Sequence, residues 1–391
     1  MIPRLLFDLT ATQPASGSKR HGGGIYGEIV LKRIIQRNLE VEVVFDSSLW
    51  LNPDIQQLLD THGIISHDNA GTTLQAIADR ANCDRVYTCG ENPQFRSLIH
   101  PMKFYTLHGM RELETPLDNY FYRYRNTTRN KIKFLFKQLL HTRYRAKHTA
   151  RVLNMIESGT RFVVVSNHTA NSIKAFFPQY ATRHIPVFYS PSTITQLSTT
   201  EPHTPAQASD HTPYFLIVSA NRWEKNSLRA IMALDRAFDT TLLDGYKAIL
   251  TGVDSPHHFR YKFKHPERFE FKGYITDAQL NHLYANAYTL IYPSLNEGFG
   301  YPPLEAMYHH VPVIASPYTS IPEICGDAAI YFNPLSVDEI LARIIMITDP
   351  GIHAHYSTLG HNRYQHIVQR QQRDLDNLID YLYDTPSPHS K

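Results

Sequence analysis

Short apolar runs recur along this chain, and each is followed by a loop and then by a segment with helical periodicity. In the first half the runs cover residues 4–9, 41–45, 85–89, 103–107, 161–166 and 184–189. They restart at residues 214–219 and continue at 247–251, 269–274, 287–292 and 311–315. Runs of this length are typical of buried strands, and their alternation with helices predicts parallel sheets. Because the chain has 391 residues and the pattern restarts, we expect two α/β domains.

The stretch from Tyr292 to Ala315 combines a strand end, a glycine-containing loop and a helix start. Pro302 and Pro303 lie where the helix should begin, a position that proline favours. Glu297 lies in the loop and Glu305 near the helix start, at the edge where open α/β sheets bind ligands. A carboxylate accepts hydrogen bonds in pairs, so both acids suit a polyhydroxylated ligand. The alternative is that they are solvated or cap the helix.

The segment Glu297-Gly-Phe-Gly-Tyr-Pro-Pro-Leu-Glu305 resembles the E-x7-E signature of the retaining GT-B glycosyltransferases. The following segments 312–316 (PVIAS) and 321–329 (IPEICGDAA) are also similar to this family, the glycosyl transferases group 1 or family 4. The resemblance implies two Rossmann-like domains facing a central cleft, with a C-terminal helix that crosses back to the first domain. It also implies transfer of a sugar from a nucleotide diphosphate without a metal or other cofactor.

The same resemblance assigns roles to residues of the signature. Glu297 would contact the donor sugar, helped by the backbone amides of the loop at Gly298, Phe299 and Gly300. Glu305 would hold the ribose hydroxyl groups of the nucleotide.

Two cations follow the first strand of the second half, in the segment Ala220-Asn-Arg-Trp-Glu-Lys-Asn226. Arg222 can bind a diphosphate through its forked guanidinium group, and Lys225 as a point charge. The family places an arginine and a lysine here, although often farther apart than in this chain. A plain surface loop is the alternative.

Gly22-x-Gly24-x-x-Gly27 formally fits the dinucleotide fingerprint, and Asp46 follows at about the distance of 20 residues that this motif requires. However, the fingerprint needs its first glycine at the turn directly after the strand. The resemblance instead places a glycine loop here beside the donor phosphates and the acceptor, which favours that role for Gly23 and Gly24. A nicotinamide site stays open as the alternative.

Three further residues follow predicted strands and take expected roles from the resemblance. His108 comes directly after the strand 103–107 and would reach the donor sugar or the acceptor, although a lone histidine is more often structural. Gly273 and Tyr274 end the run 269–274, in the loop that lies over the nucleotide base in this family. The predicted catalytic residues are therefore Glu297, His108, Arg222 and Lys225.

Residues 119–156 contain many Lys and Arg residues with interleaved aromatics, and neither Asp nor Glu. Basic helices with aromatic anchors suit anionic membrane surfaces or a lipid diphosphate. A solvated helical face with a buried aromatic stripe is the main alternative, and nucleic acid is a weaker one. A net charge of +3 does not by itself favour nucleic acid.

Composition restricts the remaining possibilities. The 22 histidines show no metal-ligand spacing, so no metal site is expected. An odd number of cysteines, Cys83, Cys89 and Cys325, suggests a reducing compartment. No run approaches the ~20 apolar residues of a membrane-spanning helix, and the N-terminus lacks a signal-peptide core. We expect a cytoplasmic protein, with any membrane contact peripheral at the inner face.

These patterns predict a first domain at residues 1–195, a linker at 196–213, a nucleotide-sugar domain at 214–365 and a C-terminal helix and tail at 366–391. Asp374 and Asp376 in that helix are expected on a solvated face. The predicted function is retaining transfer of a hexose-type sugar from a UDP-, GDP- or dTDP-linked donor to a glycan or lipid-linked acceptor, in surface polysaccharide synthesis. The alternatives are an NAD-dependent oxidoreductase, a sugar-nucleotide epimerase, and a non-catalytic carbohydrate- or membrane-binding protein.

Overall fold

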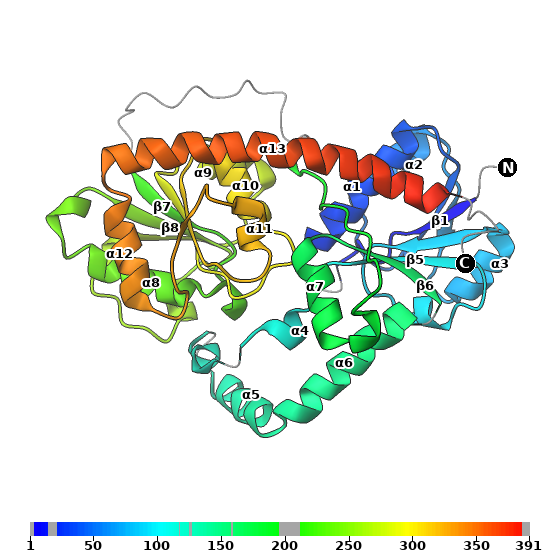
Figure 1. Cartoon of the computed structure of the whole chain (residues 1–391), viewed down its shortest axis with the longest axis horizontal. Coiled ribbons are helices and arrows are strands. Elements are labelled where there is room, and N and C mark those ends of the chain that lie inside the picture. The colour runs from blue at the N-terminus through cyan, green and yellow to red at the C-terminus, as the bar shows by residue number, and fades with distance from the viewer. Residues whose placement is uncertain are drawn as a thin grey trace. The chain divides into compact units, whose positions relative to one another are not determined.

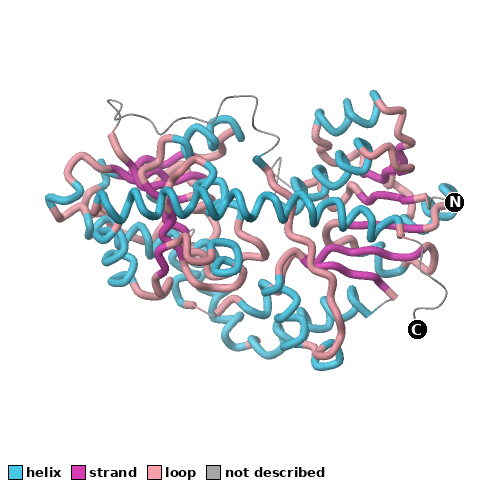
Figure 2. The backbone as a smooth tube through the Cα atoms, turned by 45° about the horizontal axis from the view of Figure 1, so that its top comes forward, coloured by secondary structure: helices cyan, strands magenta, loops and turns pink. Residues whose placement is uncertain are grey.

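The computed structural model describes residues 4–14, 22–116, 118–124, 127–157, 159–194 and 212–384. The chain divides into two compact units, each built on its own six-stranded sheet (Figures 1 and 2). Unit 1 comprises Met1–Gly109, His148–Thr193 and Gln369–Lys391, and unit 2 comprises Met110–Lys147 and Ile194–Val368. Most of the expected linker, residues 196–211, lies outside the described residues.

The sheet of unit 1 is parallel, with strand order β3-β2-β1-β4-β5-β6. Its strands are β1 (Leu5–Asp8), β2 (Val41–Phe45), β3 (Ser66–Asp68), β4 (Arg85–Thr88), β5 (Met102–Leu107) and β6 (Thr160–Val164). Its helices include α1 (Gly22–Gln36), α2 (Pro53–Thr61), α3 (Leu74–Ala81) and α7 (Asn167–Phe176). Strand order reverses between β1 and β4, so a ligand-binding crevice is expected at their carboxyl ends.

The sheet of unit 2 is also parallel and has the order β12-β11-β10-β7-β8-β9. Its strands are β7 (Tyr214–Ile217), β8 (Lys247–Thr251), β9 (Phe269–Lys272), β10 (Thr289–Tyr292), β11 (Val313–Ala315) and β12 (Ile330–Tyr331). Its helices include α8 (Ser227–Ala237), α9 (Asp277–Ala285), α10 (Tyr301–Tyr308), α11 (Ile321–Cys325) and α12 (Val337–Met346). Here the order reverses between β7 and β10.

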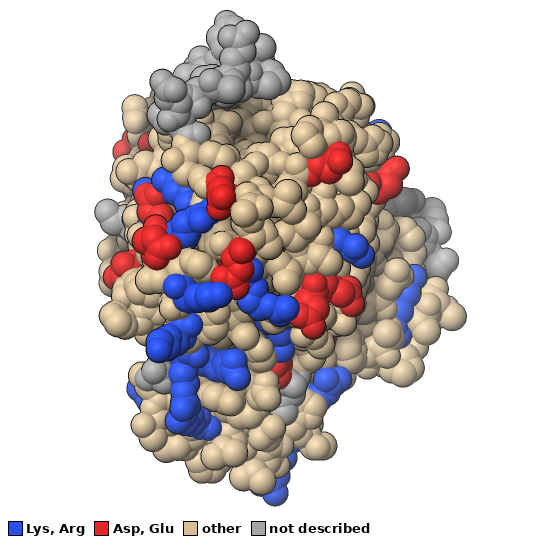
Figure 3. Space-filling view, turned by 90° about the vertical axis from the view of Figure 1, so that its left-hand side faces the viewer, with Lys and Arg blue, Asp and Glu red and all other residues tan. Residues whose placement is uncertain are grey.

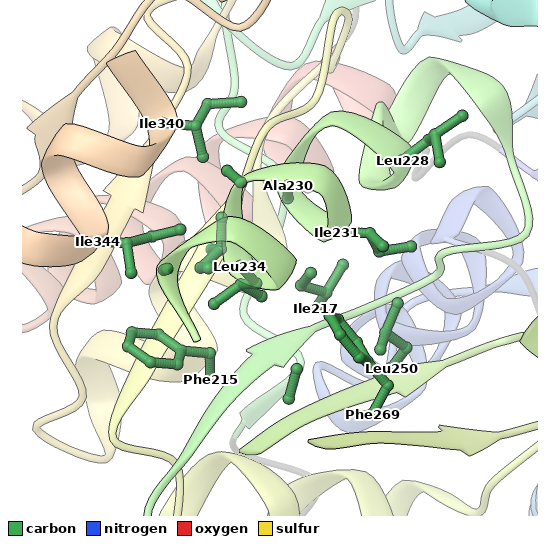
Figure 4. Close-up of a cluster of buried hydrophobic side chains, with 14 of the residues drawn as sticks. Phe215, Ile217, Leu228, Ala230, Ile231, Leu234, Leu250, Phe269, Ile340 and Ile344 are labelled. Carbon is green, nitrogen blue, oxygen red and sulfur yellow. The ribbon is translucent and has the colours of Figure 1, made fainter. Parts of the chain in front are cut away.

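Helix α8 packs between the sheet of unit 2 and helix α12, as Figure 4 shows. Leu234 of α8 is fully enclosed, with Phe215 of β7 on one side and Ile344 of α12 on the other. Burying three such side chains contributes on the order of 1.5–3 kcal/mol each. This packing fixes the first turn of α8 and therefore the loop between β7 and α8.

A helical excursion between β5 and β6 belongs mostly to unit 2. It contains α4 (Arg111–Glu114), a 3₁₀ turn at Asn119–Arg123, α5 (Thr128–Leu139) and α6 (His141–Glu157). Two of its aromatic residues pack inward: the Tyr124 hydroxyl accepts a hydrogen bond from Leu228 N (2.8 Å), and the Phe121 ring meets Trp223 edge-on (5.4 Å). The expectation that these aromatics anchor a membrane is therefore wrong for Phe121 and Tyr124.

Helix α13 (Pro350–Tyr383) begins earlier than the sequence suggested and supplies residues to both units. Its last part packs on unit 1, where Ile379 is fully buried. Asp374 accepts a hydrogen bond from Tyr189 N (3.0 Å), and Asp376 pairs with Arg33 of α1 (2.8 Å). The expectation of a solvated face is therefore wrong for Asp374, which is buried, while Asp376 is partly exposed and paired.

Two other local expectations also differ from the structure. Residues 184–189 form only an isolated bridge, Val164 with Val187, instead of a strand. The glycines at 22–24 form the first turn of α1 and not a loop before it. Farther along α1, the helix packs closely on the sheet: a Cβ on Gly27 would lie 2.5 Å from Cys89 Sγ. Among the described helices, none is long and apolar enough to span a bilayer.

Candidate active site in unit 2

The predicted site residues of the second half follow the two strands that flank the reversal in unit 2. Lys225 lies in the short turn Trp223–Lys225 after β7, and Glu297 lies in the loop after β10. Since β7 and β10 are neighbouring parallel strands, their carboxyl ends bring the two loops to the same edge of the sheet. This is the position at which open α/β sheets bind ligands.

Lys225 and Glu297 form an ion pair at this edge. Lys225 Nζ donates to Glu297 Oε1 at 2.6 Å and to the Tyr292 hydroxyl at 3.1 Å. The two charged side chains are only 8% and 13% exposed. A second donor, Ser294 Oγ, lies 2.5 Å from the same carboxylate oxygen. The pair is therefore held in a fixed geometry and is shielded from water.

Burial and pairing act on both pKa values. Burial alone raises the pKa of Glu297, but Lys225 and the hydroxyl donors outweigh it and hold the pKa below its usual value. Burial lowers the pKa of Lys225, with a further push from the nearby Arg222 and Arg111, while Glu297 opposes this change. We conclude that Glu297 carries its negative charge at neutral pH.

Backbone contacts fix the loop that carries Glu297. The amide of Glu297 donates to Thr319 Oγ1 (2.9 Å), and Ser320 Oγ donates to the carbonyl groups of Glu297 and Phe299 (2.9 and 2.7 Å). On the other side, Asn296 Nδ2 donates to Glu114 of α4 at 2.8 Å. The helical excursion thus supports the loop directly.

The loop continues into α10 as the sequence predicted. Phe299 is buried, and Gly300 adopts a φ of 122°, which favours glycine, directly before the helix begins at Tyr301. Gly298 is half-buried. Glu305 follows within α10, and its carboxylate lies near Tyr284 of α9. Burial raises the pKa of Tyr284, and the negative charge of Glu305 raises it further.

Three cations gather near this edge. Arg222 is exposed at the start of its turn, and Arg111 is exposed at the first residue of α4. Both lower the pKa of Lys225 electrostatically, which places their charges near its ammonium group. No role was predicted for Arg111 from the sequence, because 114 residues separate it from Lys225 and no local motif links them.

Gly273 and Tyr274 follow β9, on the other side of β8 from β7. The carbonyl of Gly273 accepts a hydrogen bond from Gly252 N (3.0 Å), which ties this loop to the end of β8. Tyr274 is 73% exposed, so its ring is available to a ligand. Their role at the nucleotide base stays a prediction.

The remaining predicted residues belong to unit 1 and gather there around Cys89. His108 Nε2 lies 2.7 Å from the Cys89 carbonyl, and Cys89 Sγ donates to the carbonyl of Gly23 (3.7 Å). Gly24 is buried in the first turn of α1. These residues therefore meet at the reversal between β1 and β4, and their contribution to catalysis stays a prediction.

Three observations bear on cofactors. No group of three or more His, Cys, Asp or Glu residues with metal-binding geometry occurs within the part of the chain that the structure describes. Asp46, the acid of the nicotinamide alternative, accepts hydrogen bonds from the Ser48 amide and hydroxyl (2.9 and 2.5 Å). In addition, residues 9–21 separate β1 from the first glycine, which does not fit the tight turn of the dinucleotide fingerprint.

A comparison with solved structures shows what fold this is. The chain aligns with WaaG, described as a glycosyltransferase involved in lipopolysaccharide biosynthesis, at a TM-score of 0.67 over 97% of this chain and 100% of that one, with 14% identity. The fold is GT-B. Since the identity is low, this likeness concerns the GT-B architecture alone.

Sequence comparisons match parts of this GT-B chain. Residues 200–363 match the family model Glycosyl transferases group 1. A 75-residue segment, 19% of the chain, is 51% identical to O-antigen chain mannosyltransferase B of Escherichia coli, over 20% of that protein. A 133-residue segment, 33% of the chain, is 29% identical to O-antigen chain mannosyltransferase RfbU of Salmonella typhimurium, over 36% of that protein. The matches thus span well under half of these relatives.

Proposed function

We propose that this protein is a glycosyltransferase that moves a hexose-type sugar from a nucleotide diphosphate to a glycan or lipid-linked acceptor. The observation that carries the proposal is the buried Lys225–Glu297 pair, with Glu305 beyond it, at the strand-order reversal of unit 2. This pair lies within residues 200–363, the part that matches the glycosyl transferases group 1. Mannose is the proposed sugar, because both relatives are named mannosyltransferases.

The chemistry assigns a task to each residue. Bond cleavage at the sugar C1 leaves negative charge on the departing diphosphate, and Lys225, Arg222 and loop amide groups would stabilise that charge. Glu297 would position the sugar and stabilise positive charge that develops on its ring. Glu305 would accept hydrogen bonds from the ribose hydroxyls. The acceptor oxygen forms the new bond to C1, and its proton passes to the leaving phosphate.

We further propose that the configuration at C1 is retained and that the product belongs to surface polysaccharide synthesis at the inner face of the membrane. The E-x7-E pattern supports retention, and the names of the two O-antigen relatives support the pathway class. Proton NMR of the product bond would report retention or inversion directly.

A thermal-shift panel tests the proposal first. It contains UDP, GDP, dTDP, their sugar forms including GDP-mannose, and NAD(H). A ligand at ~100 times its dissociation constant stabilises the native state by roughly 2.7 kcal/mol, which is measurable. We expect stabilisation by one nucleotide diphosphate family and its sugar forms. Stabilisation by NAD(H) alone would contradict the proposal, and donor consumption without acceptor would indicate an epimerase.

A further inference from the structure

Helix α5 carries an apolar stripe on its outer side. The stripe consists of Ile132, Leu135, Phe136 and Leu139, extended by Leu140 directly after the helix. These side chains are 49%, 56%, 59%, 80% and 43% exposed, respectively. Their spacing of three, four and seven residues places them on one side of an α-helix. Residues of this kind in such a row are normally buried, so the stripe requires an explanation.

The opposite side of α5 is fixed to unit 2. Phe134 is buried and stacks near Phe121 (6.2 Å), while Asn130 Nδ2 donates to the Tyr124 carbonyl (3.0 Å). Lys137 lies over the rings of Phe121 (5.5 Å) and Trp223 (5.7 Å). The helix therefore presents its apolar stripe in a defined orientation, as part of the surface of unit 2.

Cations border the stripe on both sides. On a helical projection Lys131 and Lys133 fall on opposite edges of it, and Arg129 precedes it by one turn. All three are exposed, and residues 119–156 contain no acidic side chain that would neutralise them. Figure 3 shows Lys and Arg gathered on the lower part of one face of the molecule, with most Asp and Glu higher on it.

We propose that this outer face of α5 lies in the interface of an anionic lipid bilayer. An apolar stripe with cationic edges matches a layer in which acyl chains lie beneath negatively charged headgroups. Nucleic acid would leave the apolar stripe unused. The inference rests on the proposed function in one respect, because the bilayer would also hold a lipid-linked acceptor. The observations that support membrane binding itself concern α5 alone.

Vesicle co-sedimentation tests the proposal with the full-length protein. The vesicles are phosphatidylglycerol with phosphatidylethanolamine, compared with pure phosphatidylcholine. We expect binding to the anionic vesicles and little binding to the neutral ones. The variant Lys131→Glu/Lys133→Glu should bind at least about 25-fold more weakly, since each basic residue contributes about a fivefold factor. The variant Leu135→Ser/Phe136→Ser/Leu139→Ser should bind at least about tenfold more weakly, because it removes the apolar area that would enter the bilayer.

A matched control is Leu242→Ser, which removes an apolar side chain elsewhere on unit 2 that is 58% exposed. It should bind vesicles as the unchanged protein does. Absence of binding to anionic vesicles, or equal binding by the serine triple variant, would overturn the proposal. A third outcome would also overturn the proposal: the unchanged protein is a dimer, and the serine triple variant is a monomer that still binds vesicles. The stripe would then join two copies of the chain.

The nucleotide thermal shift separates this inference from the proposed function. All of these variants leave Lys225, Glu297 and Glu305 unchanged and should keep the nucleotide-induced shift. Loss of vesicle binding with an intact shift supports the α5 face. A protein that binds vesicles through α5 but shows no shift with any nucleotide diphosphate would contradict the proposed function alone.

Discussion

Lys225 and Glu297 depend on each other, because each is almost fully enclosed and each lowers the cost of keeping the other charged. Removing one partner of such a pair is expensive, typically about 3–5 kcal/mol, because an unpaired charge stays buried. The pair therefore serves two purposes in the proposed site. It keeps Glu297 ionised beside the sugar, and it holds Lys225 where a diphosphate would arrive.

Replacing Lys225 by alanine should reduce turnover on the order of 100-fold or more, the usual effect of losing a group that stabilises transition-state charge. The pKa of Glu297 should also rise, since only the hydroxyl donors then oppose the effect of burial. Steady-state kinetics and the pH profile of turnover measure both effects. The matched control is Lys247→Ala. Lys247 also pairs with a glutamate, Glu270, but both of these side chains are about one-third exposed. A near-normal rate for Lys225→Ala would remove this residue from the site.

Glu305→Ala should weaken nucleotide binding by roughly 1–3 kcal/mol, the range for losing a charged hydrogen-bond partner. Titration calorimetry with the nucleotide that gives a thermal shift measures this change. Glu267→Ala is the control, because its side chain is 67% exposed and lies in a different loop of unit 2. Unchanged affinity in Glu305→Ala would exclude the ribose assignment.

At the scale of elements, helix α1 shows packing overriding local preference. Glycine disfavours helix interiors, and the resemblance placed a glycine loop at Gly23 and Gly24. The structure begins α1 at Gly22, since Gly24 is buried and Gly27 packs against Cys89. The same helix then uses Arg33 to bind Asp376 of α13.

Asp376→Asn should destabilise the protein at pH 7 by less than about 1 kcal/mol, because the Asp376–Arg33 pair is about 40% exposed and screened by solvent. The hydrogen bond from Arg33 holds the pKa of Asp376 below 3.8. The stability that ionised Asp376 contributes is therefore fully present above about pH 4, and it is lost as pH falls through the folded-state pKa of Asp376.

Urea unfolding at several pH values between 7 and 3 measures this difference. The gap in unfolding free energy between the unchanged protein and Asp376→Asn should narrow toward the acidic end. Asp338→Asn, at a more exposed pair with Arg236, should give a smaller effect. A gap that stays constant down to pH 3 would exclude the Arg33 pairing.

At the scale of the whole molecule, each unit has its own sheet and its own buried side chains, and α13 contributes to both. Arg85 of β4 donates to the carbonyl of Leu382, and Ile379 is fully buried in unit 1. The end of α13 is thus part of the core of unit 1, although it is distant in sequence from the strands that it covers.

Ile379→Ala should destabilise unit 1 by about 2–4 kcal/mol, the cost of a cavity in a packed core. Hydrogen exchange should rise in β1, β4 and β5, while β7 and β8 keep their protection because their core lies in unit 2. Met346→Ala, in the half-buried layer around the core of unit 2, should give the converse pattern. An equal rise in both sheets after Ile379→Ala would contradict separate cores.

The sequence by itself determined most of the strands, the loop from Pro293 to Gly300 and the helix at Pro302, because strand burial and proline placement are encoded locally. It missed the mostly exposed strand β3, which has no apolar run, and it predicted a strand at residues 184–189 that forms only a bridge. Only the tertiary structure decided which side chains meet. Lys225 and Glu297 are 72 residues apart, and Asn296 and Glu114 are 182 apart. Such pairs depend on strand order and on where the excursion after β5 packs, and no periodic pattern of neighbouring residues records either one.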